Sequence, residues 1–175
     1  MTERNRTAES GAAARAAHAP SVGDRYWRVL VEVAPRLLSL LDREERSPTR
    51  GSFDRVNWAW KFRDFPLTMW QASMMPLATL WRTPHVGNPY GENERLAEWL
   101  SSALSHTIDR QHRNGAFDSF TPFSQDHGVT LAMVLTLCTT AELLGPALAP
   151  ALATRTRDAV ARACRFAHAS DEDYA

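Results

Sequence analysis

The tetrapeptides Gly-Ser-Phe-Asp at residues 51–54 and Gly-Ala-Phe-Asp at residues 115–118 are two copies of one pattern. Each copy is followed by a stretch without charged residues, at 65–81 and at 128–141. A helix that is apolar on all sides must be covered on all sides, whereas a helix with one apolar stripe lies at a surface. An amphipathic, charge-bearing stretch follows each apolar one. The chain therefore repeats a unit of loop, apolar helix, turn and amphipathic helix.

Helical periodicity predicts five helices, and no stretch of useful length alternates with the period of two that a strand requires. We expect an all-α fold in which two inner helices are the most buried and two amphipathic helices lie outside them. This alternation is typical of a partial α/α toroid, a double-layered ring of helical hairpins. The expected helices cover residues 21–44, 66–81, 92–113, 126–144 and 150–168, and the second and fourth of these are the inner ones.

The sequence divides into a short tail and one domain. Residues 1–20 are rich in Ala, Arg, Glu and Ser and lack an apolar stripe, which predicts a disordered tail. Residues 21–175 are expected to form a single partial-toroid domain. The chain stops at a polar stretch where the pattern calls for another inner helix, and repeat proteins usually finish with an atypical cap. The sequence therefore predicts the N-terminal part of a longer ring, with an uncovered edge open to self-association.

Composition excludes several classes of partner. The 175 residues include 20 basic and 20 acidic side chains, so the formal net charge is zero, and neither nucleic acid nor a membrane is an expected partner. No secretory signal is evident, which predicts a cytoplasmic location. Cys138 and Cys164 are expected as small, buried hydrophobic residues. No metal-ligand spacing and no Gly-rich phosphate loop occurs, so no metal and no cofactor are predicted.

The expected binding site is the end of the ring where the loops leading into the inner helices gather and form a cleft. Asp54, Asp126 and His127 are the catalytic candidates, because carboxylate and imidazole groups can transfer protons. The other candidates are aromatic, charged or amide side chains that suit contact with a sugar polymer. These substrate-binding candidates are Trp58, Trp60, Lys61, Arg63, Asp64, Gln71 and Asp118.

Each candidate also has a structural interpretation. The two tryptophans can cover the apolar faces of pyranose rings, or they can wedge helices apart. Arg63 or Lys61 can pair with the carboxylate of a uronic acid. The aspartates of the two tetrapeptides can instead bond nearby backbone amides, as Asp does in turns. Asp64 is suited to cap a helix, and His127 at a helix start is also compatible with a structural role.

Two stretches of the chain resemble a known group of proteins. The stretch from Ser47 to Gln71, which contains Gly-Ser-Phe-Asp and Trp-Ala-Trp-Lys-Phe-Arg-Asp, is similar to a segment of uncharacterised bacterial α/α-toroid proteins associated with polysaccharide gene clusters. The stretch from Asn114 to His127 fits the same pattern. Rings of that group resemble those of heparinase II/III-like lyases and six-hairpin glycosidases. In such lyases, part of the catalytic set comes from later hairpins and a following β-domain.

The resemblance, which covers roughly residues 25–175, implies recognition or processing of a bacterial polysaccharide, with acidic polymers among the candidates. Whether the chain is catalytic stays open, and an enzyme of this kind would be a polysaccharide lyase or a glycoside hydrolase. The alternative is a non-catalytic helical interaction module. A terpenoid-cyclase-like toroid is a weaker alternative, because the Asp-rich motifs of such enzymes do not occur.

Overall fold

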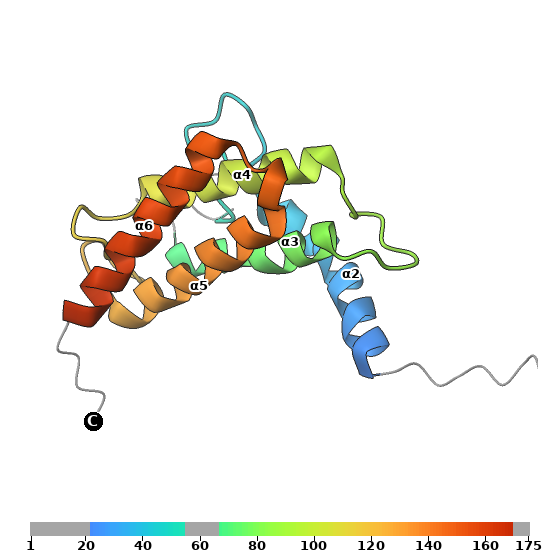
Figure 1. The fold of residues 1–175 in the computed structure, drawn as a ribbon, viewed down its shortest axis with the longest axis horizontal. Coiled ribbons are helices and arrows are strands. Elements are labelled where there is room, and N and C mark those ends of the chain that lie inside the picture. Colours follow the sequence, from blue (N-terminus) through green and yellow to red (C-terminus); the bar gives the residue numbers. More distant parts are fainter. Residues whose placement is uncertain (1–21, 55–66, 170–175) are drawn as a thin grey trace, which may run out of the picture.

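The computed structural model describes residues 22–54 and 67–169, which form helices joined by loops (Figure 1). Within these residues the only β-type pairing is an isolated bridge between Phe117 and Asp126. The expected all-α class is therefore confirmed. The α-helices are α2 (Val22–Leu40), α3 (Met74–Arg82), α4 (Glu94–Asp109), α5 (His127–Leu144) and α6 (Pro150–Ala169), and the short 3-10 helices are η2 (Thr68–Ser73) and η3 (Gly145–Ala147).

The helices are arranged as two stacked hairpins. Helix α3 packs against α4, and α5 packs against α6, while α3 also packs against α5 and α4 against α6. Figure 1 shows α3 and α5 side by side in the lower half of the molecule and α4 above them, while α6 runs diagonally from the top down to the level of the start of α5. Helix α2 packs against α3. Two stacked hairpins with a preceding helix match the predicted order of elements.

The second expected helix is divided into two parts. Residues Thr68–Ser73 form a 3-10 helix, and the α-helix begins only at Met74. Proline has no N–H group, so it is tolerated in the first turn of an α-helix and is disruptive further inside one. Because α3 begins at Met74, Pro76 falls in its first turn. The prediction of one continuous α-helix over 66–81 is therefore wrong in this respect.

The glycine of each repeated tetrapeptide contacts the backbone of an amphipathic helix. Gly51 and Gly115 have φ angles of +89° and +102°, which favour glycine. A Cβ atom on Gly51 would lie 2.3 Å from the carbonyl oxygen of Ser102 in α4. On Gly115 it would lie 2.2 Å from the carbonyl oxygen of Arg162 in α6. The repeated motif therefore docks each entry loop onto the outer helix of its own hairpin.

The phenylalanine of each tetrapeptide lies in the core. Phe53 and Phe117 are both fully buried. The buried backbone N–H of Phe117 donates to the hydroxyl oxygen of Thr130 at 2.9 Å. In the first repeat the amide group of Gln71 takes the same place: in the amide orientation that satisfies both neighbours, its oxygen accepts from Phe53 N at 3.2 Å and its nitrogen donates to Gly51 O at 3.3 Å. Gln71 of η2 and Thr130 of α5 thus each bond the backbone of the tetrapeptide that precedes them.

Burial of the inner helices differs from the prediction. Five residues of α3 are buried, but α5 is exposed along one side, where Leu131 is 47% and Leu135 is 59% exposed. The prediction that both inner helices are covered all round is therefore wrong for α5, because no described element packs on that side. Cys138 and Cys164 are also exposed, contrary to the prediction that they are buried.

Helix α5 has the length and composition of a membrane-spanning helix. In the described part of the chain, His127–Ala147 is the one helical stretch that is long and apolar enough to cross a membrane, and 39% of its apolar 18-residue segment is buried in the protein. Core helices of water-soluble proteins can have the same length and apolar composition. Since α5 packs against α3 and α6, its apolar character is explained in part by the core that it forms.

Candidate functional site

The two repeated aspartates close the two entry loops. The Oδ2 atom of Asp54 accepts a hydrogen bond from the backbone N–H of Leu67 at 2.6 Å. The Oδ1 atom of Asp118 accepts one from the backbone N–H of Gln125 at 3.0 Å. Each bond joins the end of a tetrapeptide to a residue one or two positions before the next helical segment. The carboxylates therefore hold Asp54 to Leu67 and close the loop 119–124, in agreement with the structural interpretation of these aspartates.

Asp54 and Gln71 are both buried side chains. Asp54 is 0% exposed and Gln71 is 3% exposed. Gln71 lies against the tetrapeptide that Asp54 ends, so the structure brings these two candidates together. The remaining candidates of this loop lie outside the described residues: Trp58, Trp60, Lys61, Arg63 and Asp64.

The candidates Asp126 and His127 begin helix α5. The Oδ1 atom of Asp126 accepts a hydrogen bond from the backbone N–H of Val129 at 2.8 Å, which makes Asp126 the N-cap of the helix. Ser124, two residues earlier, accepts a hydrogen bond from Ser119 N at 2.8 Å. His127 is the first residue of α5 and is partly exposed. The pair therefore marks the start of the helix at the entry-loop end.

A contact between an imidazole and a carboxylate lies at the base of the second loop, and the sequence analysis did not find it. The Nε2 atom of His112 is 2.8 Å from Oδ1 of Asp118, and the two side chains are 21% and 23% exposed. The two atoms are in contact without the alignment of a linear hydrogen bond. The turn at Gly115 produces this contact, since His112 N donates to Ala116 O at 3.0 Å and Gly115 N donates to His112 O at 2.9 Å.

The surroundings of Asp118 favour its charged form. Burial raises the pKa of the Asp118 carboxyl group, but the N–H groups of Gln125 and Phe123 and the His112 imidazole together lower it below 3.8. A carboxylate held ionised beside an imidazole can fix the orientation of that ring. His112 and Asp118 are thus the acid-base pair that the described part of the entry-loop end contains.

The second entry loop exposes two aromatic rings on a constrained backbone. Phe120 is 72% and Phe123 is 79% exposed. Phe123 and Gln125 have φ angles of +62° and +46°, which residues other than glycine rarely adopt. The side chains of Asn114 and Gln125 are joined by a 2.7 Å hydrogen bond, which helps to hold this shape. Exposed aromatic rings on a strained, well-bonded loop are a feature of ligand sites.

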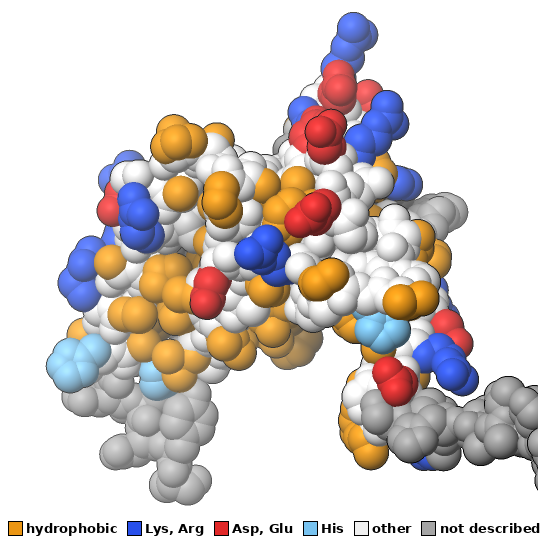
Figure 2. Space-filling model, turned by 45° about the vertical axis from the view of Figure 1, so that its right-hand side comes forward, with side chains coloured by type: hydrophobic (Ala, Val, Ile, Leu, Met, Phe, Trp, Pro, Cys, Tyr) orange, Lys and Arg blue, Asp and Glu red, His pale blue; other side chains and the backbone are white. Residues whose placement is uncertain are grey.

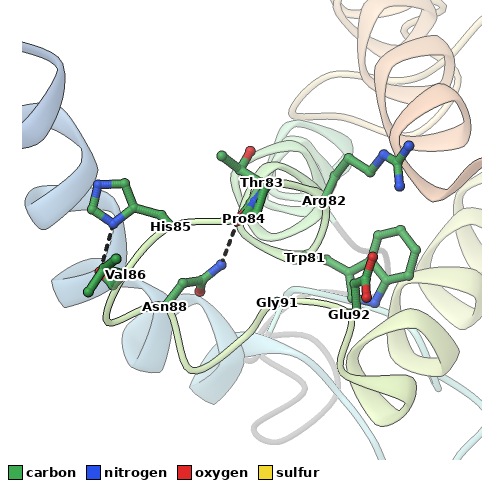
Figure 3. A pocket seen from close by; sticks show the side chains of 9 residues that line it. All are labelled: Trp81, Arg82, Thr83, Pro84, His85, Val86, Asn88, Gly91 and Glu92. Carbon is green, nitrogen blue, oxygen red and sulfur yellow. Dashed lines mark hydrogen bonds between the residues drawn. The ribbon is translucent and has the colours of Figure 1, made fainter.

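A hollow lies at the opposite end of α3, where the sequence did not predict a site. It has a volume of about 810 Å³ and opens between the α3–α4 loop and the start of α4 (Figure 3). The ring of His85 stacks on Trp27 of α2 at a centroid distance of 4.6 Å. The amide of Asn88 donates to the carbonyl oxygens of Leu80 and Thr83, so it holds the end of α3. The hollow is shallow, and its bonded polar groups stabilise the turn.

No known family, characterised protein or solved structure matches the chain. Among residues 22–54 and 67–169, no group of three or more His, Cys, Asp or Glu side chains is placed to hold a metal ion. The chemistry of the site must therefore be inferred from the loop geometry and from the sequence.

Proposed function

We propose that this chain recognises an acidic polysaccharide through the entry-loop end of a partial α/α toroid. The observation that carries the proposal is the pair of closed loops. Asp54 and Asp118 each fix a loop base by accepting a backbone hydrogen bond, at 2.6 and 3.0 Å. Both loops precede inner helices that pack side by side. Two loops fixed in this way can contact successive units of one polymer.

The side chains of the two loops suit a sugar with a carboxylate group. Phe120 and Phe123 expose most of their surface on the second loop, and aromatic faces can cover the apolar face of a pyranose ring. The first loop contains Trp58, Trp60 and Arg63 in its sequence. A guanidinium group forms two parallel hydrogen bonds with a carboxylate, which selects a uronic acid over a neutral sugar.

Recognition is a better-supported activity than catalysis. The carboxylates of Asp54 and Asp126 accept backbone hydrogen bonds, and the Asp54 side chain is buried. Proton transfer to a substrate requires a group within hydrogen-bond reach of it. The partly exposed pair of His112 and Asp118 and the partly exposed His127 are the remaining acid-base candidates among the described residues at this end. If the chain is an enzyme, we propose this pair as its centre, in a lyase-like or hydrolase-like reaction.

Calorimetric titration with oligogalacturonate and with a neutral gluco-oligosaccharide of equal length tests the proposal. Oligogalacturonate is expected to bind, and the neutral sugar is expected to bind more weakly. Replacing Phe123 by Ala should weaken binding without unfolding the chain, because its ring is 79% exposed. The matched control is Val86→Ala, since Val86 is 96% exposed at the other end of α3. Equal loss of affinity in both variants, or no binding of either oligosaccharide, would contradict the proposed function.

A further inference from the structure

A smaller hollow lies between the loop that follows α2 and the outer helix α4. It has a volume of about 310 Å³, and its lining includes Arg50 from this loop and His106, Asp109 and Arg110 from α4 and its C-terminal cap. We call the space between these four residues the α4 hollow. Figure 2 shows charged side chains of both signs gathered at the top of the molecule, the height at which the loop lies in Figure 1. Because both signs are present, the unused donors and acceptors of the hollow must decide which ligand fits it.

The carboxylates near the α4 hollow already have partners. Oδ1 of Asp109 is 2.7 Å from Nη2 of Arg155, and Oε1 of Glu98 is 2.8 Å from Nη2 of Arg50. The buried Asp42 carboxylate accepts hydrogen bonds from two hydroxyl groups of its own loop. The negative charges around the hollow are therefore compensated by the protein itself.

The two arginines of the α4 hollow have more donors than the protein uses. A guanidinium group carries five N–H donors. Arg50 donates from Nη2 to Glu98, and its buried Nε atom has no hydrogen-bond partner among the described residues. Within residues 22–54 and 67–169, the Arg110 side chain makes no hydrogen bond or ion pair. The surplus in the hollow is thus one of positively charged donors, which favours an anion.

His106 is the buried polar side chain of the α4 hollow. It is 7% exposed, and its Nε2 atom has no hydrogen-bond partner in the described part of the chain. Burial, followed by the charge of Arg110, lowers its pKa to about 4, whereas Asp109 and Asp42 act in the opposite direction. The ring is therefore uncharged at neutral pH. An anion beside Arg110 would offset that positive charge and allow a protonated His106 to donate from Nε2.

We propose that the α4 hollow binds a phosphate group, held by the guanidinium groups of Arg50 and Arg110 and by the Nε2 atom of His106. The donors come from two different elements, and the several oxygens of a phosphate accept from different directions, whereas a carboxylate suits a single planar fork. The volume of 310 Å³ is near the lower end of the roughly 300–1,000 Å³ of small-molecule sites, so a small group attached to the phosphate also fits.

The phosphate site is independent of the proposed polysaccharide site. Its donors lie on the loop after α2 and on α4, whereas the proposed sugar contacts include Phe120 and Phe123 of the second entry loop. Phe123→Ala should therefore leave phosphate binding unchanged. Loss of one activity without the other distinguishes failure of this inference from failure of the proposed function.

Calorimetric titration with inorganic phosphate tests the site. The wild-type chain is expected to bind, and Arg110→Gln should weaken binding by about 10-fold or more, because charge-assisted hydrogen bonds are lost. Arg82→Gln is the matched control, since Arg82 is also exposed but lines the hollow at the other end of α3. It should leave the affinity unchanged. Circular dichroism checks that both variants keep their helices.

Glycerol phosphate and glycerol distinguish the two sources of a phosphate group. Tighter binding of glycerol phosphate than of inorganic phosphate would identify an ester as the ligand, and the reverse order would identify the free ion. Either order supports the site. Glycerol alone is expected not to bind, because it lacks the charge that the two arginines recognise.

The ring of His106 provides a readout that a purely structural role would not change. Sulfate is the probe here, because its charge stays constant over the pH range of the titration. Bound sulfate should raise the pKa of His106 from about 4, because a nearby anion favours the imidazolium form. Nuclear magnetic resonance follows the ring, and the exposed His168 is the internal control, whose pKa should not change.

Three results would overturn this inference. The first is a wild-type chain that binds neither inorganic phosphate nor glycerol phosphate. The second is an equal loss of affinity in Arg110→Gln and Arg82→Gln, which would indicate attraction to surface charge in general. The third is an unchanged titration of His106 when sulfate is bound, which would place the anion elsewhere.

Discussion

The α-carbon of Gly115 lies so close to the backbone of Arg162 that a Cβ atom built on it would be 2.2 Å from the Arg162 carbonyl oxygen. Gly51 has the same relationship with Ser102, at 2.3 Å. In both cases the obstructing atoms belong to a helix backbone, which cannot move aside as a flexible side chain can. The glycine of the repeated tetrapeptide is therefore required by two constraints, a positive φ angle and a close helix contact.

Gly115→Ala should destabilise the fold by about 3 kcal/mol or more, because the chain must both adopt a strained φ and separate the loop from α6. Gly87→Ala is the matched control. Gly87 also has a positive φ, of +80°, but a Cβ there meets nothing within 4 Å. It should cost only about 1–2 kcal/mol, the conformational part alone. Urea unfolding of both variants measures the difference, and equal losses would show that the close contact yields when the side chain is added.

His106 should make stability depend on pH. It is 7% exposed, and burial, followed by the charge of Arg110, lowers its pKa from 6.5 to about 4. Asp109 and Asp42 act in the opposite direction. The unfolded chain therefore binds a proton between pH 6.5 and about 4 that the folded chain does not bind. Stability that is present above pH 6.5 is lost as the pH falls through this window.

The loss from His106 is expected to approach about 3 kcal/mol below pH 4, because its pKa is lowered from 6.5 to about 4 and each pH unit corresponds to about 1.36 kcal/mol. Other groups also titrate in this range, so the measurement is the difference between the wild type and His106→Leu. The wild-type stability should fall more steeply between pH 7 and 4 than that of the variant. Parallel curves would show that His106 is not responsible.

Asp126 was a catalytic candidate and is the N-cap of α5. Asn caps helices about as well as Asp, whereas Ala does not, so Asp126→Asn should keep the stability and Asp126→Ala should lose about 1 kcal/mol. Binding of oligogalacturonate should survive Asp126→Asn. If this variant stayed fully folded and lost an activity of the wild type, Asp126 would have a chemical role in addition to capping.

The sequence was sufficient to predict the order and class of the helices because the pattern that decides them is local. Gly-x-Phe-Asp followed by an apolar stretch indicates where each hairpin begins, and Gly115 and Phe117 confirm that interpretation by docking and burial. Coverage of α5 could not be predicted in the same way. A lack of charge shows that a helix prefers an apolar environment, but it does not show that this chain supplies one around Leu131 and Leu135.

The candidate site was predictable only in part, because the roles of its residues depend on backbone geometry. Asp54 and Asp118 were identified from their repeat positions, and their bonds to Leu67 and Gln125 correspond to the structural interpretation. The contact of His112 with Asp118 depends on the tight turn at Gly115, which brings together residues on either side of the motif. A search that paired residues across each Gly-containing turn would have suggested it.

Two buried threonines of α5 offer a matched test of how the second entry loop is held. Thr130 and Thr140 are both 0% exposed. The Thr130 hydroxyl accepts from Phe117 N at 2.9 Å and donates to Asp126 O at 2.7 Å, whereas the Thr140 hydroxyl has no hydrogen-bond partner. The same isosteric change at the two positions therefore removes a full pair of bonds in one case and an unsatisfied polar group in the other.

Thr130→Val should cost about 1–3 kcal/mol, because it leaves the buried N–H of Phe117 without an acceptor. Thr140→Val should be neutral or stabilising by about 1 kcal/mol, since burying an unbonded hydroxyl is unfavourable and valine has the same shape. Chemical denaturation of both variants gives the comparison. Hydrogen exchange at the Phe117 amide should become faster in Thr130→Val and stay unchanged in Thr140→Val. If the two substitutions had the same effect on stability, the Thr130 hydroxyl would not be what holds the loop to α5.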